Sequence, residues 1–399
     1  MNGDKSLTSK EIFNLALQNY KNNNFNNAKN LYEKILNINP KNVEAQYSLG
    51  NVFYKLGQYQ KALTNYKKTI QIDPKYVKAH YNTGVILHEL GDYKKSLTSY
   101  KKTIQLDTKH VKAHNNLGIV LDELREIKKA KKCYEKAIII DPNYVDPYWN
   151  LHSLASSIDE ALTILKKLNK INKNFFEAKI MISALKGFKS DFKDFNLLIK
   201  SKDSNHPMLR SVKWVFSLPK LPKIFFNRWD FFDFVATLAD KSRPFYEFGV
   251  WRGVSFKYLL KIFKKGFGFD TFTGLPEDWY NKSSGSYSGF GKIPKFKGGK
   301  FIVGKFEDTL PKFFSKQRSL ASILNYDADL YSSTLCALNN TNKIIDKKSI
   351  LIFDEFLTNK NWEKDEYKAL NEFCDNFDYS YEVLAVSFYS KQVAVKLSK

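Results

Sequence analysis

The sequence has little that would mark a membrane or secreted protein. It contains no uninterrupted apolar run near the roughly 20 residues that a helix needs to cross a bilayer. Its first residues, MNGDKSLTSKE, lack the apolar core and cleavage pattern of a secretory signal. The three cysteines, Cys133, Cys336 and Cys374, are far apart and form no CxxC pair. These absences argue against a disulfide framework and a zinc site, and they predict a soluble, cytoplasmic protein.

Arginine is also scarce, because only six of the 64 basic residues are arginine and the rest are lysine. The formal net charge of +23 would suit a nucleic-acid-binding protein. Proteins that read bases favour the forked guanidinium group, for which lysine is no substitute. We therefore expect a lysine-covered surface and no specific nucleic-acid partner. The 399 residues, 43% of them apolar, suffice for two or more folded domains.

The first half of the chain is dominated by an internal repeat. Segments 43–76, 77–110 and 111–144 align without gaps at a period of 34, and a fourth copy fits at 9–42. A small residue recurs where two helices must approach closely, at Ala16, Gly50, Gly84 and Gly118. A large ring recurs in the adjoining core, at Tyr32, Tyr66, Tyr100 and Tyr134. Prolines are expected to stop the second helix of three repeats, at Pro40, Pro74 and Pro142.

This pattern resembles the tetratricopeptide repeat. The resemblance implies an α-solenoid of helix pairs whose groove holds a peptide or protein ligand. Residues 145–201 keep a helical period but lose the repeat spacing, so we expect a degenerate repeat and cap that end the solenoid at residue 201. Residues 202–240 are expected to form a connector and a leading helix, and residues 241–399 a separate domain.

Short apolar segments alternate with helical ones from residue 244 onward. The expected strands are FYEFGV (245–250), GFGFDTF (266–272), FIVGKF (301–306), LASILNYD (320–327), SILIFDE (349–355), YEVLAVSF (381–388) and QVAVKLS (392–398). Such alternation predicts a parallel sheet covered by helices on both faces. The last two strands follow one another without a helix, which predicts an antiparallel hairpin.

Glycines follow the first expected strand, where the chain must turn sharply against a ligand. Gly249 and Gly253 lie in this turn, and Asp270 ends the next strand, 21 positions after Gly249. An acidic side chain at this spacing can bind the ribose of a nucleoside. The GxGxxG spacing of dinucleotide enzymes is absent. A nucleoside without a pyrophosphate therefore fits better than a nicotinamide or flavin cofactor.

Five strings in order, FYEFGVWRGVS, FDTFTGLPEDW, GKFEDTLP, YDADLYSST and LIFDEF, resemble the motifs of class I S-adenosylmethionine-dependent methyltransferases. The similarity is greatest to the macrocin O-methyltransferase-like family and covers roughly residues 225–399. It implies a Rossmann-like sheet of seven strands in the order 3-2-1-4-5-7-6. It also implies a set of cofactor-binding residues: Glu247, Gly249, Gly253 and Ser255 near the methionine part, Asp270 on the ribose, and Phe306 and Glu307 beside the adenine.

Carboxylates end the fourth and fifth expected strands. Asp327, Asp354 and Glu355 would meet at one edge of the sheet, where a hard cation such as Mg²⁺ would relieve their repulsion. The resemblance implies a divalent metal that binds the acceptor hydroxyl there, although Glu355 stands where relatives carry Asp or Asn. The alternative is a carboxylate cluster that caps loops. Asp329, two residues after Asp327, is a candidate fourth member.

No lysine base is expected, because Leu330 occupies the place of the catalytic lysine of the related catechol enzymes. All six histidines precede residue 207, so none lies in the expected catalytic domain. Deprotonation would fall to the metal with Asp327 or Asp329, or to solvent. The long segment from Pro276 to Lys300 is expected to be a lid. Its aromatic residues Trp279, Tyr280, Tyr287 and Phe290 would suit a sugar or aromatic ring, or alternatively would pack back on the domain.

The sequence thus predicts an α-solenoid followed by a Rossmann-like methyltransferase domain. The expected activity is magnesium-assisted O-methyl transfer from S-adenosylmethionine to a hydroxylated small molecule or glycan, with the repeats recruiting a protein partner. Two alternatives stay open. The repeats could deliver a protein substrate to the same site, or the whole chain could be a non-catalytic scaffold.

Overall fold

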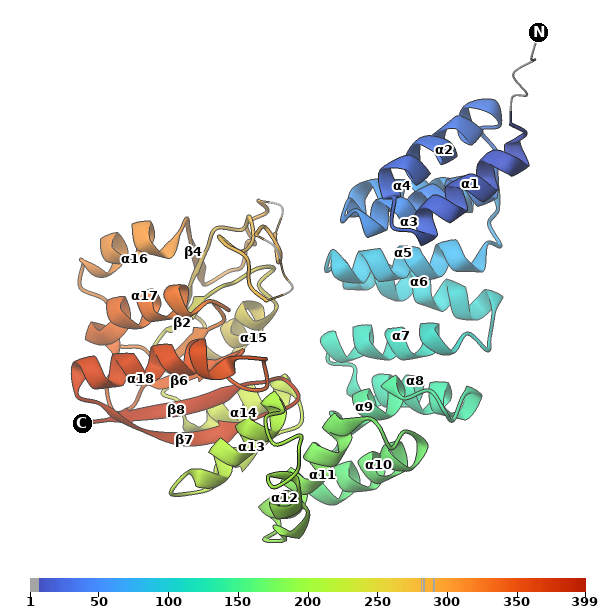
Figure 1. Ribbon diagram of the computed structural model, residues 1–399. Helices are drawn as coiled ribbons and strands as arrows, with labels where there is room; N and C mark the ends of the chain where they lie inside the picture. The colour runs from blue at the N-terminus through green and yellow to red at the C-terminus, as the bar shows by residue number, and fades with distance from the viewer. Residues whose placement is uncertain (1–6, 281, 283, 290) are drawn as a thin grey trace. The chain divides into compact units, whose positions relative to one another are not determined.

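The computed structural model describes residues 7–280, 282, 284–289 and 291–399 (Figure 1). The chain divides between Leu151 and His152 into two compact units, which are treated in turn. Across the described ranges, no helix combines the length and the apolar character that a membrane span requires. Phe290, named above for the expected lid, lies outside the described residues.

The first unit is an array of antiparallel helix pairs with the predicted period. The first helices of the four repeats are α1 (Ser9–Lys21), α3 (Val43–Lys55), α5 (Val77–Glu89) and α7 (Val111–Glu123). The second helices are α2 (Phe25–Ile38), α4 (Tyr59–Ile72), α6 (Tyr93–Leu106) and α8 (Ile127–Ile140). Each helix occupies the same place in its repeat, which confirms the repeat boundaries read from the sequence.

The second helices end at the same position whether or not a proline follows. In three repeats the helix ends two residues before Pro40, Pro74 or Pro142, as predicted, but α6 ends equally far before Thr108. An Asn or Asp just after the helix explains the common end. In the four repeats the side-chain oxygen of this residue accepts a backbone N–H two residues on, at Lys41, Lys75, Lys109 and Asn143. This turn competes with a further helical bond.

The small residues of the first helices face the tyrosines of the second helices, as the sequence predicted. A methyl group placed on the glycine would lie 2.6, 2.7 or 2.5 Å from the nearest ring carbon in the pairs Gly50–Tyr66, Gly84–Tyr100 and Gly118–Tyr134. All three rings are almost fully buried. Glycine is therefore required because the two helices approach closely and leave no room for a side chain.

Successive repeats are joined by a recurring hydrogen bond between their first helices. Asn82 Nδ2 donates to the hydroxyl of Tyr47 at 3.0 Å, and Asn116 Nδ2 donates to the hydroxyl of Tyr81 at 3.1 Å. The donor and acceptor are 35 residues apart in both cases. The same contact thus fixes two neighbouring repeat interfaces.

The predicted end of the solenoid at residue 201 differs from the structure. Residues 145–201 form α9 (Asp146–His152), α10 (Ile158–Ile171), α11 (Phe176–Phe188) and α12 (Lys193–Leu198), with Pro147 in the first turn of α9. The last three of these helices belong to the second unit, because the division falls at Leu151 and His152.

Aromatic residues of α13 (Pro207–Ser217) explain this boundary. Phe216 packs against three rings from the end of α11 and from α12, those of Phe188, Phe192 and Phe195, at centroid distances of 5.6, 5.2 and 4.9 Å. Trp214 packs against Phe356 and Trp362, which follow the sheet strand β6 (Ile350–Phe353). One helix therefore joins the expected cap to the sheet, where the sequence suggested only a connector.

The second unit contains an eight-stranded sheet in the order β1-β7-β8-β6-β5-β2-β3-β4. Besides β6, its strands are β1 (Lys223–Ile224), β2 (Phe245–Phe248), β3 (Gly266–Asp270), β4 (Gly299–Val303), β5 (Ile323–Tyr326), β7 (Ser380–Val386) and β8 (Val393–Ser398). The strands β4, β3, β2, β5 and β6 run parallel, and β8 runs antiparallel to both β6 and β7. Counted from β2, the seven expected strands have the order 3-2-1-4-5-7-6. The short edge strand β1 was not predicted.

Helices cover both faces of this sheet (Figure 1). On one face α14 (Arg228–Leu238) and α15 (Val254–Phe263) share a core with Phe245, Ile323 and Ile352 of the strands. On the other face lie α16 (Phe306–Phe314), α17 (Tyr331–Thr341) and α18 (Glu366–Phe377). Alternate residues of a strand point to opposite faces of the sheet. Because helices cover both faces, the buried strands are apolar at nearly every position.

Candidate functional site

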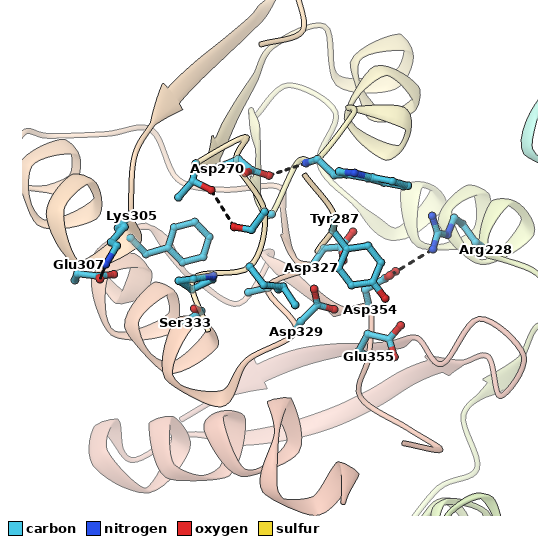
Figure 2. Close-up of a pocket in the computed structure, with 18 residues that line it drawn as sticks. Arg228, Asp270, Tyr287, Lys305, Glu307, Asp327, Asp329, Ser333, Asp354 and Glu355 are labelled. Atoms are coloured by element: carbon cyan, nitrogen blue, oxygen red, sulfur yellow. Dashed lines mark hydrogen bonds and ion pairs between the residues drawn. The ribbon is translucent and has the colours of Figure 1, made fainter. Parts of the chain in front are cut away.

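A pocket opens at the carboxyl ends of β2, β3, β5 and β6, with roughly 1000 Å³ of empty space including its mouth (Figure 2). The strand order reverses between β2 and β5, and ligands of open α/β sheets bind at such a point. Eight of the residues predicted for the site line this pocket: Gly249, Asp270, Phe306, Glu307, Asp327, Asp329, Asp354 and Glu355. The other three, Glu247, Gly253 and Ser255, do not line it.

A row of stacked aromatic rings aligns the carboxyl ends of four adjacent strands. Phe269, Phe248, Tyr326 and Phe353 belong to β3, β2, β5 and β6, and adjacent rings lie 5.0–5.1 Å apart within 15° of parallel. The residue after each ring, in the same order, lines the pocket: Asp270, Gly249, Asp327 and Asp354. Rigid rings in register therefore hold four pocket residues at one level.

The turn after β2 can form only with glycine at its first position. Gly249 has φ of 88°, and a Cβ atom there would lie 1.7 Å from the backbone oxygen of Asp327. Gly253, with φ of 72°, precedes the first residue of α15. Between them Trp251 also has a positive φ of 50°. The glycines predicted to bind cofactor therefore shape the turn, and only Gly249 borders the pocket.

Asp270 stabilises this turn by accepting hydrogen bonds from backbone N–H groups. Its Oδ2 accepts the backbone N–H groups of Val250 and Trp251 at 2.7 and 2.6 Å, and its Oδ1 accepts that of Phe272 at 2.6 Å. The carboxylate thus holds the turns after β2 and β3 together while it lines the pocket. Bonds from N–H groups to an ionised acceptor are among the stronger hydrogen bonds in proteins.

Glu247 and Ser255 lie behind the pocket. Glu247 is fully buried in β2, and Ser255 Oγ, near the start of α15, donates to its Oε1 at 2.7 Å. Burial raises the pKa of Glu247 to about 8, although Ser255 and Asn325 of the adjacent strand partly stabilise the charged form. The sequence placed these two residues beside the methionine part of a cofactor. In the structure they support the turn from within the core.

Phe306 and Glu307 open α16 at the far end of the pocket from Arg228 (Figure 2). Phe306 is only partly buried and meets Phe248 edge-on, with ring centroids 6.1 Å apart. One face of the ring is therefore not needed for packing against the sheet. Lys305 Nζ lies 3.8 Å from Glu307 Oε1, so this carboxylate is paired with a cation.

Asp327 and Asp329 point toward the same region of the pocket as Asp354 and Glu355 (Figure 2). Over the ranges that the structure describes, neither of these aspartate side chains has a hydrogen bond or an ion pair. Burial, followed by repulsion from neighbouring carboxylates, raises the pKa of Asp329 to about 8 and the pKa of Asp327 well above its ordinary range. Asp329 also has φ of 60°, an uncommon conformation that aspartate tolerates better than most residues.

Asp354 and Glu355 are paired with protein donors. Asp354 lies 3.4 Å from Arg228 and also accepts a hydrogen bond from Gln392. Glu355 Oε2 lies 2.8 Å from Lys391 Nζ. Arg228 is the first residue of α14, whereas Lys391 and Gln392 lie between β7 and β8.

The magnesium site expected from Asp327, Asp354 and Glu355 does not form with these side-chain positions. Among the residues that the structure describes, no group of three or more His, Cys, Asp or Glu side chains is arranged to hold a metal ion. The physical reason is that Arg228 and Lys391 already neutralise two of the three expected ligands. A divalent cation there would be repelled by both.

Several pocket residues were not predicted from the sequence, notably Arg228, Trp251, Lys305 and Ser333. The sequence signal that could have drawn attention to Arg228 is that arginine is rare in this chain. Five of the six arginines make specific contacts within the second unit: Arg210 with Glu363, Arg228 with Asp354, Arg243 with Asp346, Arg252 with Trp251, and Arg318 with Phe313. Tyr287, which the sequence assigned to the lid, does line the pocket.

Comparison with known families identifies the first unit. Residues 16–57, 50–91 and 84–124 match the TPR repeat family, and residues 111–144 match the tetratricopeptide repeat family. Residues 16–144 are therefore tetratricopeptide repeats, a module that indicates a peptide or protein ligand. No curated protein matches the chain.

Several solved structures match part of this chain at low sequence identity and low TM-score. The crystal structure of MamA protein has 24% identity and a TM-score of 0.39, and it covers 42% of this chain and 94% of its own. MamA from Desulfovibrio magneticus RS-1 has 21% identity and a TM-score of 0.38, covering 43% and 96%. YrrB, described as a TPR protein with an unusual peptide-binding site, has 21% identity and a TM-score of 0.38, covering 43% and 90%. At these TM-scores the likeness carries no information on function.

Proposed function

We propose that the second unit is an S-adenosylmethionine-dependent methyltransferase that acts on the hydroxyl group of a small molecule or glycan. The observation that carries the proposal is the pocket at the reversal of a sheet with strand order 3-2-1-4-5-7-6. This is the order implied by the resemblance to class I methyltransferases. Residues from all five resembling strings line that one pocket, although the strings are spread over more than a hundred residues of sequence.

The cofactor would occupy the side of the pocket formed by Gly249, Asp270 and Phe306. Gly249 leaves room beside the backbone, Asp270 offers an ionised carboxylate to ribose hydroxyls, and Phe306 offers a ring face to adenine. When bound, S-adenosylmethionine supplies an electrophilic methyl group on a sulfonium. The described residues supply no tight metal site, so the proposal assigns the chemistry to side chains.

The acceptor side is formed by Arg228, Asp327, Asp329, Asp354 and Tyr287. Arg228 holds Asp354 in place, while Asp327 and Asp329 are available to accept a proton from the acceptor hydroxyl. A raised pKa suits a general base that works near neutral pH. For Asp329 the value is about 8. The proton would move from the acceptor oxygen to a carboxylate Oδ as the oxygen–methyl bond forms and the sulfur–methyl bond breaks, which would leave a neutral thioether.

Calorimetric titration of the full chain with S-adenosylhomocysteine tests the cofactor assignment. We expect saturable binding, and a loss of about fivefold or more in Phe306→Ala, because stacking of a base on an aromatic ring contributes about 1–3 kcal/mol. Val303→Ala, on the exposed edge of the strand before α16, is the matched control and should bind normally. Absence of binding to the unmodified chain would refute the methyltransferase assignment.

The repeats favour a second function that does not exclude the first. Residues 16–144 form a protein-interaction module. The module would recruit a partner, deliver a protein substrate to the pocket, or act as a scaffold by itself. Methylation with radiolabelled S-adenosylmethionine distinguishes these roles: label in a protein band indicates a protein substrate, label in a small metabolite indicates the O-methyltransferase, and no cofactor binding indicates a scaffold.

A further inference from the structure

The positive charge of the repeats is concentrated on one set of helices. The second helices, α2, α4, α6 and α8, contain 14 lysines and two glutamates. The first helices, α1, α3, α5 and α7, contain five lysines and five acidic residues. Neither set contains arginine. A general lysine bias of the sequence would add lysine to both sets alike, so it does not explain this difference.

The lysines of the second helices lie on the side that faces away from the packed interior of the unit. In α6 the buried side chains are Ser96, Tyr100 and Thr103. With about 3.6 residues per turn, the four lysines of this helix fall on its opposite side. They are exposed or partly exposed: Lys94, Lys95, Lys101 and Lys102. The first helices bond to one another through the asparagine–tyrosine contact between repeats, so the second helices form a separate, outer layer of the array.

The lysines also recur at fixed positions of the repeat. One position of the second helix is lysine in all four repeats: Lys34, Lys68, Lys102 and Lys136. Another position, seven residues earlier, is lysine in three repeats: Lys61, Lys95 and Lys129. Seven residues are two helical turns, so the two rows lie about 10 Å apart on the same side of their helices. The lysines of α2, α4, α6 and α8 therefore form a two-dimensional array, which we call the lysine face.

An exposed isoleucine lies within the lysine face. Ile139 of α8 is 70% exposed, more than any other large apolar side chain that the structure describes. Lys132 and Lys136 precede it by seven and three residues, which places the three side chains on one side of the helix. The two preceding repeats carry glutamine at the position of Ile139, namely Gln71 and Gln105. An aliphatic side chain gains nothing from phosphate groups, but it is stabilised at the boundary between lipid headgroups and acyl chains.

Three kinds of polyanion can neutralise the lysine face: a nucleic acid, an acidic protein and an anionic lipid bilayer. A nucleic acid is disfavoured because the second helices lack the guanidinium fork, and their recurring tyrosines are buried and offer no ring for base stacking. An acidic protein would need matching rows of carboxylates and an apolar site for Ile139. A bilayer offers both negative charge in two dimensions and an apolar boundary beneath it.

We infer that the second helices of the repeats bind the surface of an anionic lipid bilayer, so that the protein associates with membranes peripherally. The lysines contact the headgroups, and Ile139 enters the interface. No helix in the described part of the chain could span a membrane, so this attachment is reversible and sensitive to salt. The inference does not depend on the proposed methyltransferase activity, and it leaves the first helices to a peptide or protein ligand.

Co-sedimentation of the full chain with lipid vesicles tests the inference. Vesicles of phosphatidylcholine with about 30 mol% phosphatidylserine are compared with vesicles of phosphatidylcholine alone, in about 0.1 M salt. We expect at least about tenfold tighter binding to the anionic vesicles, and loss of this binding in about 0.5 M salt, which screens surface charges. Equal binding to the two kinds of vesicle, or no binding to either, would overturn the inference.

Two variants with the same change in net charge locate the binding surface. One replaces four lysines of the lysine face: Lys94→Gln, Lys95→Gln, Lys101→Gln and Lys102→Gln. The matched control replaces four exposed lysines of the first helices: Lys10→Gln, Lys21→Gln, Lys55→Gln and Lys78→Gln. We expect the affinity for anionic vesicles to fall at least about tenfold in the first variant and less than about threefold in the control. An equal loss in both would mean that net charge alone drives binding, which would contradict the inference. Circular dichroism and thermal unfolding check that both variants fold.

The replacement Ile139→Gln distinguishes a bilayer from other polyanions. The side chain is exposed and glutamine occupies its position in two other repeats, so the fold should be kept. We expect the affinity for anionic vesicles to fall about threefold or more, and the affinity for a duplex DNA to stay unchanged. An unchanged affinity for the vesicles would refute the choice of a bilayer. So would binding of duplex DNA or poly-glutamate that is tighter, per anionic charge, than binding of the vesicles.

Discussion

Replacing Asp270 by asparagine should disable the cofactor side of the pocket without removing any side-chain volume. The carboxylate accepts three backbone N–H groups, two at Oδ2 and one at Oδ1. Asparagine has a single acceptor oxygen. Whichever way the amide is oriented, at least one N–H group loses its acceptor and faces the amide NH₂ instead.

The expected loss follows from that count. A hydrogen bond to a charged group contributes about 1.5–3 kcal/mol, and each 1.4 kcal/mol corresponds to about tenfold in affinity. We therefore expect Asp270→Asn to bind S-adenosylhomocysteine about 10- to 100-fold more weakly in a calorimetric titration. Asp308→Asn is the control, as an exposed aspartate of the same unit. An affinity of Asp270→Asn within twofold of the unmodified chain would refute the role given to this carboxylate.

A second comparison separates the contact with ribose from the organisation of the turn. If Asp270 binds the ribose hydroxyls, the unmodified chain should prefer adenosine to 2′,3′-dideoxyadenosine, and Asp270→Asn should lose this preference. If Asp270 only organises the turn, both nucleosides should weaken by the same factor in the variant. The ratio of the two affinities is therefore informative even when the absolute affinities are low.

Three further experiments test the packing of the repeats at Gly118, the buried carboxyl group of Glu247 and the binding of Mg²⁺. Gly118→Ala should lower the free energy of unfolding by about 1–2 kcal/mol in urea, because the new methyl group would lie 2.5 Å from Tyr134 and outweigh the gain in helix propensity; an unchanged midpoint would contradict this. Burial raises the pKa of Glu247 from 4.5 to about 8, so the folded state keeps a proton that the unfolded state releases. Stability should therefore fall as pH rises from about 4.5 to 8, by up to about 1.4 kcal/mol per pH unit, and Glu247→Gln should reduce this slope in unfolding curves. Titration with Mg²⁺ should show no saturable binding below millimolar concentration, since Asp354 and Glu355 are paired with protein cations; micromolar binding would restore the metal site.

The repeat array and the strand positions were predictable because both depend on local patterns. A period of 34 with a small residue opposite a tyrosine specifies a helix pair wherever it occurs, and the helix bounds follow from it. Likewise, short apolar segments between helical ones mark buried parallel strands, and all seven expected strands are present. Asp270, Asp327 and Asp354 also follow from the sequence, since residues that end adjacent strands meet at one edge of the sheet. Phe306 and Glu307 were expected only from the resemblance to methyltransferases.

What the tertiary structure decided is which distant groups meet. Arg228 precedes Asp354 by 126 residues, and no local pattern reveals that the two would pair. The division between the two units also depends on distant contacts, because Phe216 packs on rings of helices expected in the solenoid and Trp214 packs on Phe356 beyond β6. Sequence periodicity specifies secondary structure one segment at a time. The pairing of charges and the packing of rings depend on the folded chain as a whole.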